Sequence, residues 1–258
     1  MLLVRTSRIV TPTDAGLAFA EEARKVLANF ELAVAEARRA GGAGSVLRLG
    51  CIPTLPIGQL VRFLGALRER SLGARLQLSH LSTTEQVRRL RDGQLELGIF
   101  HHGTDYAELE LEPLFAGEPL AAYLPPGHRL AAKASLGPAD LLDEDLVGCA
   151  EPADPALRDR VFALFDQAGY GLGGLHEASG NDPRDVLLAV AGGSGIGLLP
   201  ASLSEIGEAG AVVSRRPLDP PVSLPDAVLA WRRKPSPPLQ AGLAAIRSAA
   251  RDLRREDD

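Results

Sequence analysis

The fold is decided between Val46 and Phe100, where the chain reads VLRLGCIPTLPIGQLVRFLGALRERSLGARLQLSHLSTTEQVRRLRDGQLELGIF. Short apolar runs in this stretch alternate with segments whose apolar residues recur at helical spacing. The expected elements are strand Val46–Cys51, a helix with Leu60, Val61, Leu64 and Leu67 on one face, strand Arg75–Leu81, a helix carrying Val87 and Leu90 that ends at Gly93, and strand Leu95–Phe100. This β-α-β-α-β order predicts parallel strands joined by right-handed crossovers, and therefore an α/β fold.

The same alternation starts again in the second half of the chain. Its expected strands are Leu120–Leu124, Leu146–Ala150, Leu175–Ala178, Ile196–Leu199 and Ala227–Trp231. Its expected helices carry Leu157 to Ala168, Val186 to Val190 and Leu239 to Leu253. Two units of this size, with one strand and one helix left over, predict two lobes joined by crossing strands, the last elements returning to the first lobe. Because ligands of open α/β sheets bind beyond the carboxyl ends of the strands, we expect a binding cleft between the lobes.

A different pattern precedes these units and predicts one long helix over residues 11–40. Thr11 and Asp14 fit a capping box, Pro12 fits the first helical position, and the glycines at 41, 42 and 44 fit its end. Apolar residues recur along this helix at alternating short spacings: Phe19, Ala23, Val26, Phe30, Ala33 and Ala37. So narrow a seam is typical of a helix that pairs with another helix, so it favours a dimer over the alternative, a helix packed on its own domain.

Composition narrows the class of protein. Of the 258 residues, 45% are apolar and 24% are charged, which supplies a core and excludes a disordered chain. No run approaches the roughly 18 uncharged apolar residues that a membrane span needs. Two cysteines, Cys51 and Cys149, are too few for a disulfide scaffold, and a net charge of −5 argues against a surface that binds nucleic acid as a whole. The N-terminus lacks the apolar core of a secretory signal, so we expect a cytoplasmic protein with reduced cysteines.

Several short segments follow one another in a characteristic order. They are Val4–Arg8 with Thr11–Gly16, then Leu47–Gly50, Leu90–Gly98, Leu124–Leu130, Gly195–Pro200 and Ala230–Arg233. Their order and spacing, over nearly the whole chain, resemble LysR-type transcriptional regulators. The resemblance implies a two-lobed effector-binding domain like the periplasmic binding proteins, built from two Rossmann-like subdomains and preceded by a long dimerisation helix. It also implies a small-molecule effector and a homodimer or tetramer, formed through that helix, that binds DNA through a winged helix-turn-helix.

The same resemblance implies boundaries along the chain. They are a wing remnant at 1–10, a linker helix at 11–40, a hinge at 41–45 and an effector-binding domain at 46–258, with lobe I at 46–117 and 222–258 and lobe II at 118–221. The family's helix-turn-helix lies ahead of the wing, so Arg5 and Arg8 are expected to contact DNA phosphates, which position a protein without specifying sequence. We expect DNA reading only if that N-terminal domain is present. A chain that starts at the wing has three open explanations: a start codon placed too late, a truncated gene, or a protein that works without DNA.

By position in its motifs, the resemblance places the effector at three turns of the first lobe and at loops of the second. The residues are Thr54, Leu55, Ser82, Thr83, Thr84, Phe100, His101, Cys149, Glu151 and Asn181. The hydroxyls of Thr54 and Thr83 fit ordinary helix caps equally well. Backbone N–H groups at helix starts favour a carboxylate, and His101 stands where several relatives place an arginine that grips one. Because histidine is only partly charged at neutral pH, His101 disfavours an obligate dianion and leaves a monoanion or a neutral aromatic acid open.

Other signals point to no cofactor, metal or catalytic site. Gly169–Gly174 spells G-x-G-x-x-G but follows a helix rather than a strand, which disfavours a dinucleotide site. The histidines at 80, 101 and 102 lack zinc-motif spacing, and Cys51 and Cys149 are more typical of buried thiols than of a redox switch across the cleft. No catalytic set assembles, so we expect no enzyme. The alternatives that remain are a stand-alone cytoplasmic binding protein or enzyme on the same fold, and a truncated modulator of a full-length relative.

Overall fold

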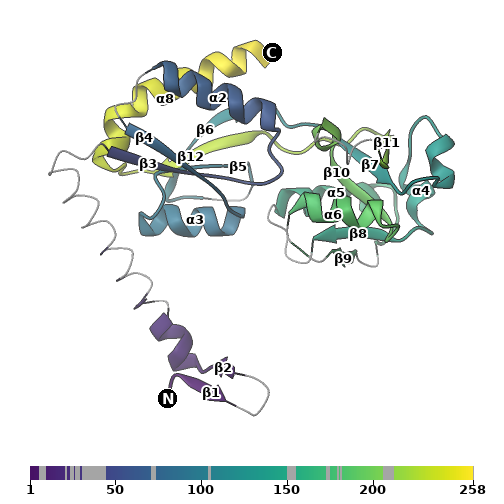
Figure 1. Ribbon diagram of the computed structural model, residues 1–258, viewed down its shortest axis with the longest axis horizontal. Helices are drawn as coiled ribbons and strands as arrows, with labels where there is room; N and C mark the ends of the chain where they lie inside the picture. The colour runs from purple at the N-terminus through teal and green to yellow at the C-terminus, as the bar shows by residue number, and fades with distance from the viewer. Residues whose placement is uncertain are drawn as a thin grey trace.

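The computed structural model contains two five-stranded sheets and an N-terminal hairpin with its helix (Figure 1). It describes residues 1–5, 10–20, 22–23, 26, 30, 45–70, 74–103, 106–149, 155–172, 175–178, 180, 182–205 and 212–257. Within this part of the chain, no helix combines the length and apolar character that crossing a membrane requires. The fold class is the predicted one: a mixed α/β protein with two lobes.

The first lobe is built on the sheet β4-β3-β5-β12-β6. Its strands are β3 (Ser45–Cys51), β4 (Ala74–His80), β5 (Leu97–His101), β6 (Leu109–Phe115) and β12 (Ala227–Arg232). Strand β3 runs parallel to both β4 and β5, whereas β12 runs antiparallel to β5 and β6. Helices α2 (Ile57–Glu69) and α8 (Pro237–Asp257) cover one face, and α3 (Thr83–Asp92) covers the other (Figure 1). The last strand and helix therefore return to the first lobe, as their position in the chain predicted.

The motifs around β3 and β5 lock these two strands together. The Arg48 guanidinium donates to both carboxylate oxygens of Glu96, at 2.8 and 3.1 Å, and the Arg48 backbone N–H donates to Glu96 Oε2 at 2.7 Å. The Glu96 backbone N–H donates back to the Arg48 carbonyl at 3.0 Å. Helix α3 ends just before, at Gly93, whose φ of +73° is the left-handed conformation that glycine adopts freely.

The second lobe is built on the sheet β11-β7-β10-β8-β9. Its strands are β7 (Leu120–Leu124), β8 (Leu146–Cys149), β9 (His176–Ala178), β10 (Ile196–Pro200) and β11 (Ser214–Pro217). Helix α5 (Pro155–Gln167) packs with alternate strand residues into one core cluster, and α6 (Pro183–Ala191) packs with the intervening ones into another. The two helices therefore cover opposite faces. The short helix α4 (Pro138–Leu141) and the turns η1 (Arg129–Ala132) and η2 (Ala201–Glu205) complete the lobe.

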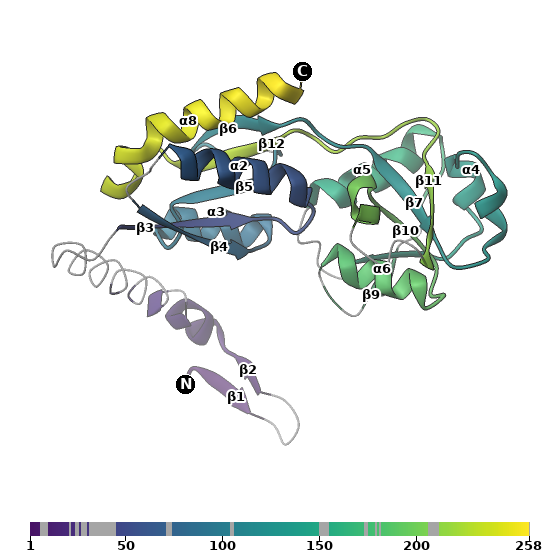
Figure 2. The ribbon, with the colours of Figure 1, turned by 45° about the horizontal axis from the view of Figure 1, so that its top comes forward.

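Two extended segments, 116–119 and 222–226, join the lobes side by side (Figure 2). The Leu120 N–H donates to the Val222 carbonyl at 2.7 Å, and the Leu224 N–H donates to the Glu118 carbonyl at 2.9 Å. Their approach is so close that a Cβ on Gly117 would lie 1.8 Å from the Leu224 carbonyl oxygen. Only glycine fits there, because it has no Cβ.

The N-terminal segment corrects the expected start of the long helix. Residues 11 and 12 lie in β2 (Val10–Pro12), which pairs antiparallel with β1 (Leu3–Arg5), and the helix starts at residue 14. Thr13 is the cap, since its hydroxyl oxygen accepts the Gly16 N–H at 3.0 Å. The predicted cap at Thr11 and Pro12 at the first helical position are wrong because hairpin pairing takes both residues. Ala33, Ala37 and the glycines at 41, 42 and 44 lie outside the described residues, and Ser45 belongs to β3 rather than to the expected hinge.

Two further expectations differ from the structure. Val61 was expected on the buried face of α2 but is 61% exposed. Phe63 lies on that face instead. The neighbours Leu60 and Leu67 are buried as predicted. The strand β6 was not predicted, since Pro113 interrupts its apolar pattern. Pro113 is tolerated in β6 because β6 is an edge strand, and one side of its backbone forms no hydrogen bonds with a neighbouring strand.

Candidate functional site

Parallel strands bring the predicted first-lobe residues to one edge of the sheet. Thr54 follows β3, Ser82 follows β4, and His101 ends β5. Because β3 lies between β4 and β5, Thr54 lies between the other two turns. Ser82 is the N-cap of α3: its hydroxyl oxygen accepts the Glu85 N–H at 3.2 Å. The edge therefore presents, in order, the start of α3, the Thr54 hydroxyl and the His101 imidazole.

Thr83 is the most informative residue at this edge. It is 5% exposed, and its hydroxyl has no hydrogen-bond partner among the described residues. It lines a hollow of about 530 Å³ between the lobes. The other lining residues are His101, His102, Gly103, Tyr106, Pro155, Ala156, Asp159, Arg160, Ala163 and Pro225. A buried polar atom without a partner is costly in a folded protein, so the Thr83 hydroxyl singles out this wall of the hollow as a place to test for ligand contact.

A buried glutamine holds α3 in register with β5 behind this hollow. The Gln86 side-chain amide donates to the carbonyls of Leu81 and Ile99, at 3.0 and 3.2 Å, and its oxygen accepts the Ile99 N–H at 3.0 Å. Gly98 is required for this fit, because a Cβ there would lie 2.9 Å from the Gln86 amide oxygen. The start of α3, and with it Thr83, is thereby fixed against the sheet.

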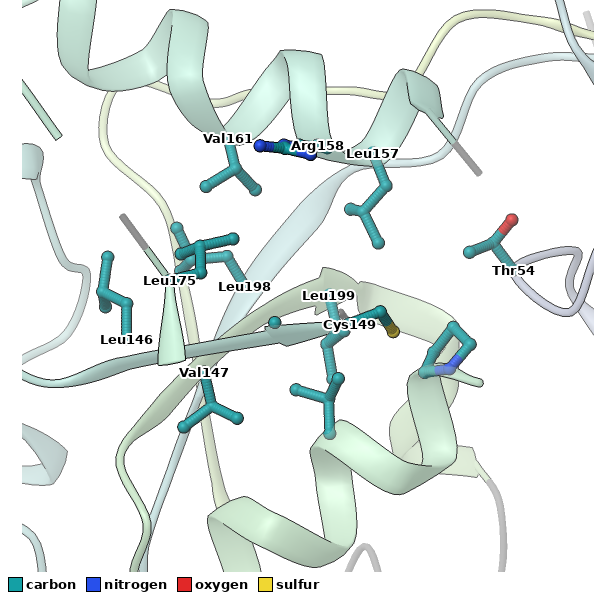
Figure 3. Close-up of a pocket in the computed structure, with 13 residues that line it drawn as sticks. Thr54, Leu146, Val147, Cys149, Leu157, Arg158, Val161, Leu175, Leu198 and Leu199 are labelled. Atoms are coloured by element: carbon teal, nitrogen blue, oxygen red, sulfur yellow. The ribbon is translucent and has the colours of Figure 1, made fainter. Parts of the chain in front are cut away.

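Two smaller hollows share Thr54. One, of about 220 Å³, lies between the start of α2 and the second lobe, and Leu55, Ile57, Arg184 and Leu203 contribute to its lining. The other is a chamber of about 40 Å³ inside the second lobe, beneath α5. Figure 3 shows Thr54 on the side of this chamber toward which the Cys149 sulfur points.

Of the two cysteines, Cys149 lines the 40 Å³ chamber and Cys51 lies in the core of the first lobe. Burial raises the pKa of Cys149 to about 11, with smaller contributions from the carboxylates of Asp182 and Asp185. Burial alone raises the pKa of Cys51 to about 11. Both are therefore protonated at neutral pH, and a protonated thiol is neither a good nucleophile nor a metal ligand.

Five of the predicted residues line the three hollows: Thr54, Leu55, Thr83, His101 and Cys149. Phe100 is fully buried and packs edge-on against Tyr106, with ring centroids 5.2 Å apart, so it supports the wall from behind. Ser82 caps α3, Leu55 lines the 220 Å³ hollow, and Thr84 is exposed. Glu151 and Asn181 lie outside the described residues. The role of each in binding stays a prediction.

The lining from α5 was not expected as part of the site. Ala156, Asp159 and Arg160 belong to a helix that the sequence predicted from its apolar face, and nothing in the pattern indicated which lobe its polar face meets. Tyr106 lies in a loop and carries no periodic signal.

The described residues give little support for a metal site or a dinucleotide site. In the described part of the chain, no three side chains of metal-ligating type come close enough to hold an ion. The G-x-G-x-x-G spelling begins at a helix end: Gly169 has a φ of +79°, and the Tyr170 N–H donates to the Phe165 carbonyl at 2.9 Å. That is the geometry of a helix C-terminus rather than a phosphate loop.

Comparison with known proteins gives a consistent result. Residues 40–251 match the family model of the LysR substrate binding domain. The transcriptional regulator AlsR of Bacillus subtilis is 26% identical over 258 residues, which cover 100% of this chain and 84% of that protein. The regulator TfdS of Cupriavidus pinatubonensis is 31% identical over 212 residues, which cover 80% of this chain and 69% of that protein.

Solved structures agree in fold. A full-length BenM variant superposes with a TM-score of 0.65 at 25% identity, covering 96% of this chain and 81% of that one. CbnR, a LysR family transcriptional regulator, gives a TM-score of 0.69 at 24% identity, covering 93% and 82%, which supports the fold alone. The family-model match, over residues 40–251, includes the residues that line the hollows.

Proposed function

This chain belongs to the LysR family of transcriptional regulators, and from that premise we propose that it senses one small organic acid in the cleft between its lobes. The bound acid would change the arrangement of an oligomer and so its binding to DNA. Its relatives are transcriptional regulators, and we assign this chain no catalytic role. We propose the cytoplasm, where its DNA target would lie, as its place of action.

The buried, unpartnered hydroxyl of Thr83 is the observation that carries the proposal. Thr83 lines a hollow of about 530 Å³, which falls within the usual size range of small-molecule sites. The first N–H groups of α3 have no acceptor within the helix and carry the positive end of its dipole. His101 lines the same hollow, and an imidazole N–H can donate a hydrogen bond to a carboxylate oxygen. Together these groups suit a carboxylate of single charge.

We infer the oligomer from the helix that begins at residue 14. Phe19, Val26 and Phe30 are exposed on it at the heptad positions that the sequence predicted. A second copy of this helix would cover them, giving a homodimer or, through further contacts, a tetramer. Arg5 lies in the β1–β2 hairpin, from which it and Arg8, outside the described residues, would contact DNA phosphates beside a helix-turn-helix domain.

Thermal denaturation with a panel of small acids tests the effector site. We expect at least one monocarboxylate, such as benzoate, to raise the melting temperature, because a ligand that binds only the folded state stabilises it. Thr83→Val removes the hydroxyl and keeps the shape, so we expect binding to weaken by about 10- to 100-fold, the usual worth of a hydrogen bond to a charged group. Thr11→Val, on the exposed hairpin, is the matched control. Binding that is equally strong in Thr83→Val would overturn the assignment.

A further inference from the structure

One buried side chain joins the turns at the cleft edge of the first lobe. The turn with Thr54 follows β3, the turn with Ser82 and Thr83 follows β4, and His101 ends β5. These turns are distant in the sequence, so their relative positions depend on contacts between them. The side chain that joins them is Gln86, which is fully buried on α3, one helical turn after Thr83.

The Gln86 amide contacts two of these turns directly. Its nitrogen donates to the carbonyl of Leu81, just before Ser82, at 3.0 Å and to the carbonyl of Ile99 at 3.2 Å. Its oxygen accepts the Ile99 N–H at 3.0 Å. Because Ile99 lies on the strand that ends at His101, a single amide connects the start of α3 with the end of β5.

The turn with Thr54 is held by the same backbone groups. The Ile52 N–H, at the beginning of that turn, donates to the Ile99 carbonyl at 3.1 Å, so this carbonyl accepts from both Ile52 and Gln86. The Leu81 N–H donates to the Cys51 carbonyl at 2.9 Å. The residues that Gln86 binds therefore also hold the end of β3.

Two glycines make room for this amide. Gly50 of β3 and Gly98 of β5 are paired in the sheet. A Cβ on Gly98 would lie 2.9 Å from the Gln86 amide oxygen, and a Cβ on Gly50 would lie 3.0 Å from its Cγ. Neither glycine has a positive φ, so the backbone alone would accept a side chain at both positions. Gln86 fills part of the space that the two glycines leave open.

Hydrogen bonds define the position of α3 more narrowly than apolar contacts would. The buried residues of α2 are all apolar: Leu60, Phe63 and Leu67. On α3 the buried residues Val87 and Leu90 are apolar as well, but Thr83 and Gln86, nearer the cleft, are polar. Because hydrogen bonds are directional, a buried polar network with its partners in place holds one arrangement. The polar part of α3 is the part at the hollow.

We propose that Gln86 is the positioning residue of the effector site: its amide fixes Thr83 relative to His101 and so sets the affinity for the acid. The inference rests on the proposed function, because it concerns the same bound acid. Gln86 is not among the residues that line the large hollow, so it acts through Thr83 rather than by touching the ligand.

Calorimetric titration of the full chain with benzoate tests the effect on binding. Gln86→Met keeps the length of the side chain and removes its three hydrogen bonds. We expect binding to weaken by about tenfold, the worth of one displaced hydrogen bond to the acid. Adding Thr83→Val to Gln86→Met should then weaken binding by less than about twofold, because the hydroxyl is already out of place.

A destabilising variant away from the network is the matched control. Leu67 is fully buried in the last turn of α2, and Leu67→Ala leaves a cavity in the same core. Leu67→Ala should leave the affinity for benzoate unchanged, and Thr83→Val should weaken binding as much in this background as in the unaltered chain. A purely structural role of Gln86 would give the same result for Gln86→Met.

Amide hydrogen exchange without ligand tests the network itself. In Gln86→Met we expect exchange to accelerate at the N–H groups of Ile52, Leu81 and Ile99 more than elsewhere in the first sheet. Leu67→Ala should not single out these three groups. Equal acceleration throughout the first sheet in Gln86→Met would overturn the role of its amide in holding the turns.

The outcomes separate the two proposals. If benzoate binds Gln86→Met as tightly as Leu67→Ala, or if the losses from Gln86→Met and Thr83→Val multiply, the positioning role is overturned while the acid site stands. An acid of the panel that binds in place of benzoate serves as the probe in the same way. If no acid raises the melting temperature of the unaltered chain, the acid site falls and the positioning role falls with it.

A second variant covers a failure of Gln86→Met to fold, as shown by circular dichroism. Gly98→Ala keeps every hydrogen-bonding group but displaces the Gln86 amide, because the added Cβ would lie 2.9 Å from its oxygen. We expect Gly98→Ala to weaken benzoate binding and to reduce the further loss caused by Thr83→Val. Unchanged affinity in a folded Gly98→Ala chain would overturn the proposal.

Discussion

Glu85 keeps its negative charge far into the acidic range. It forms ion pairs of 2.6 Å with both Arg88 and Arg89 on the same helix. The hydrogen bond from Arg88 is the largest cause, and with Arg89 it lowers the pKa of Glu85 to about 2. A carboxyl whose pKa is depressed by folding stabilises the folded state above the unfolded pKa of about 4.3. That contribution is lost as pH falls from about 4.3 toward 2.

Glu85→Gln should remove this pH dependence. Because the pairs are partly exposed, we expect a loss of about 0.5–1 kcal/mol of unfolding free energy at pH 7, shrinking as pH approaches 2. Urea denaturation at pH 7, 4 and 2.5 measures it. Glu108→Gln, which changes an exposed pair with Arg91, serves as the control. If Glu85→Gln lost the same unfolding free energy at all three pH values, the stabilisation would not come from the charge of Glu85.

The Arg48–Glu96 pair is the residue-scale contact with the largest expected energy. Glu96 is buried and receives three hydrogen bonds from Arg48. Glu96→Ala would leave the arginine without its partner, so we expect a loss of about 3 kcal/mol of unfolding free energy. Urea denaturation at pH 7 reports it, with Glu108→Ala as the surface comparison, for which at most about 1 kcal/mol is expected. Equal losses in the two variants would show that the pair has no special weight.

At the scale of elements, the N-terminal helix exposes large apolar side chains that a partner helix would cover. Phe19, Val26 and Phe30 are 59%, 66% and 66% exposed. Phe30→Asp should convert a dimer to a monomer at micromolar concentration, because each buried phenylalanine contributes about 1.5–3 kcal/mol and the dimer loses two. Sedimentation velocity measures the change. Leu17→Asp, exposed but off the seam, should stay dimeric, and a dimeric Phe30→Asp variant would place the interface elsewhere.

Prediction from sequence worked where a pattern had one physical cause. The apolar run of β5 identified that strand because a buried strand is apolar on both faces, whereas the edge strand β4 was identified by leucines that alternate with polar residues. A strand that is apolar on both faces does not indicate which of its side chains point toward the cleft. Successive residues of a strand point to opposite faces, so Phe100 and His101 cannot both face the cleft. An all-apolar strand does not reveal which one does.

Pairing between segments distant in sequence explains the remaining differences. The expected helix start at Thr11 was overridden by the β1–β2 hairpin, which a local pattern cannot report. The contribution of α5 to the cleft depends on how the lobes face each other, and that arrangement is set by the crossing segments rather than by α5 itself.

At the scale of the molecule, the cleft is governed by the two crossing segments. Asp226 connects them to the first lobe: its side chain accepts the Gly117 N–H at 3.2 Å and pairs with Arg254 of α8 at 2.8 Å, and its carbonyl accepts the His102 N–H at 2.8 Å. His102 and Pro225 also line the large hollow. A ligand in that hollow would therefore contact, through Pro225, one of the two segments that join the lobes.

The place of β12 in the first sheet has a consequence for synthesis on the ribosome. This strand lies between β5 and β6, yet it is made after every strand of the second lobe. While the chain is being translated, β5 and β6 wait with unpaired edges, whereas the second sheet is complete once residue 217 has emerged. The half of the molecule encoded first is thus finished last, and its nascent form is the one that needs protection from aggregation.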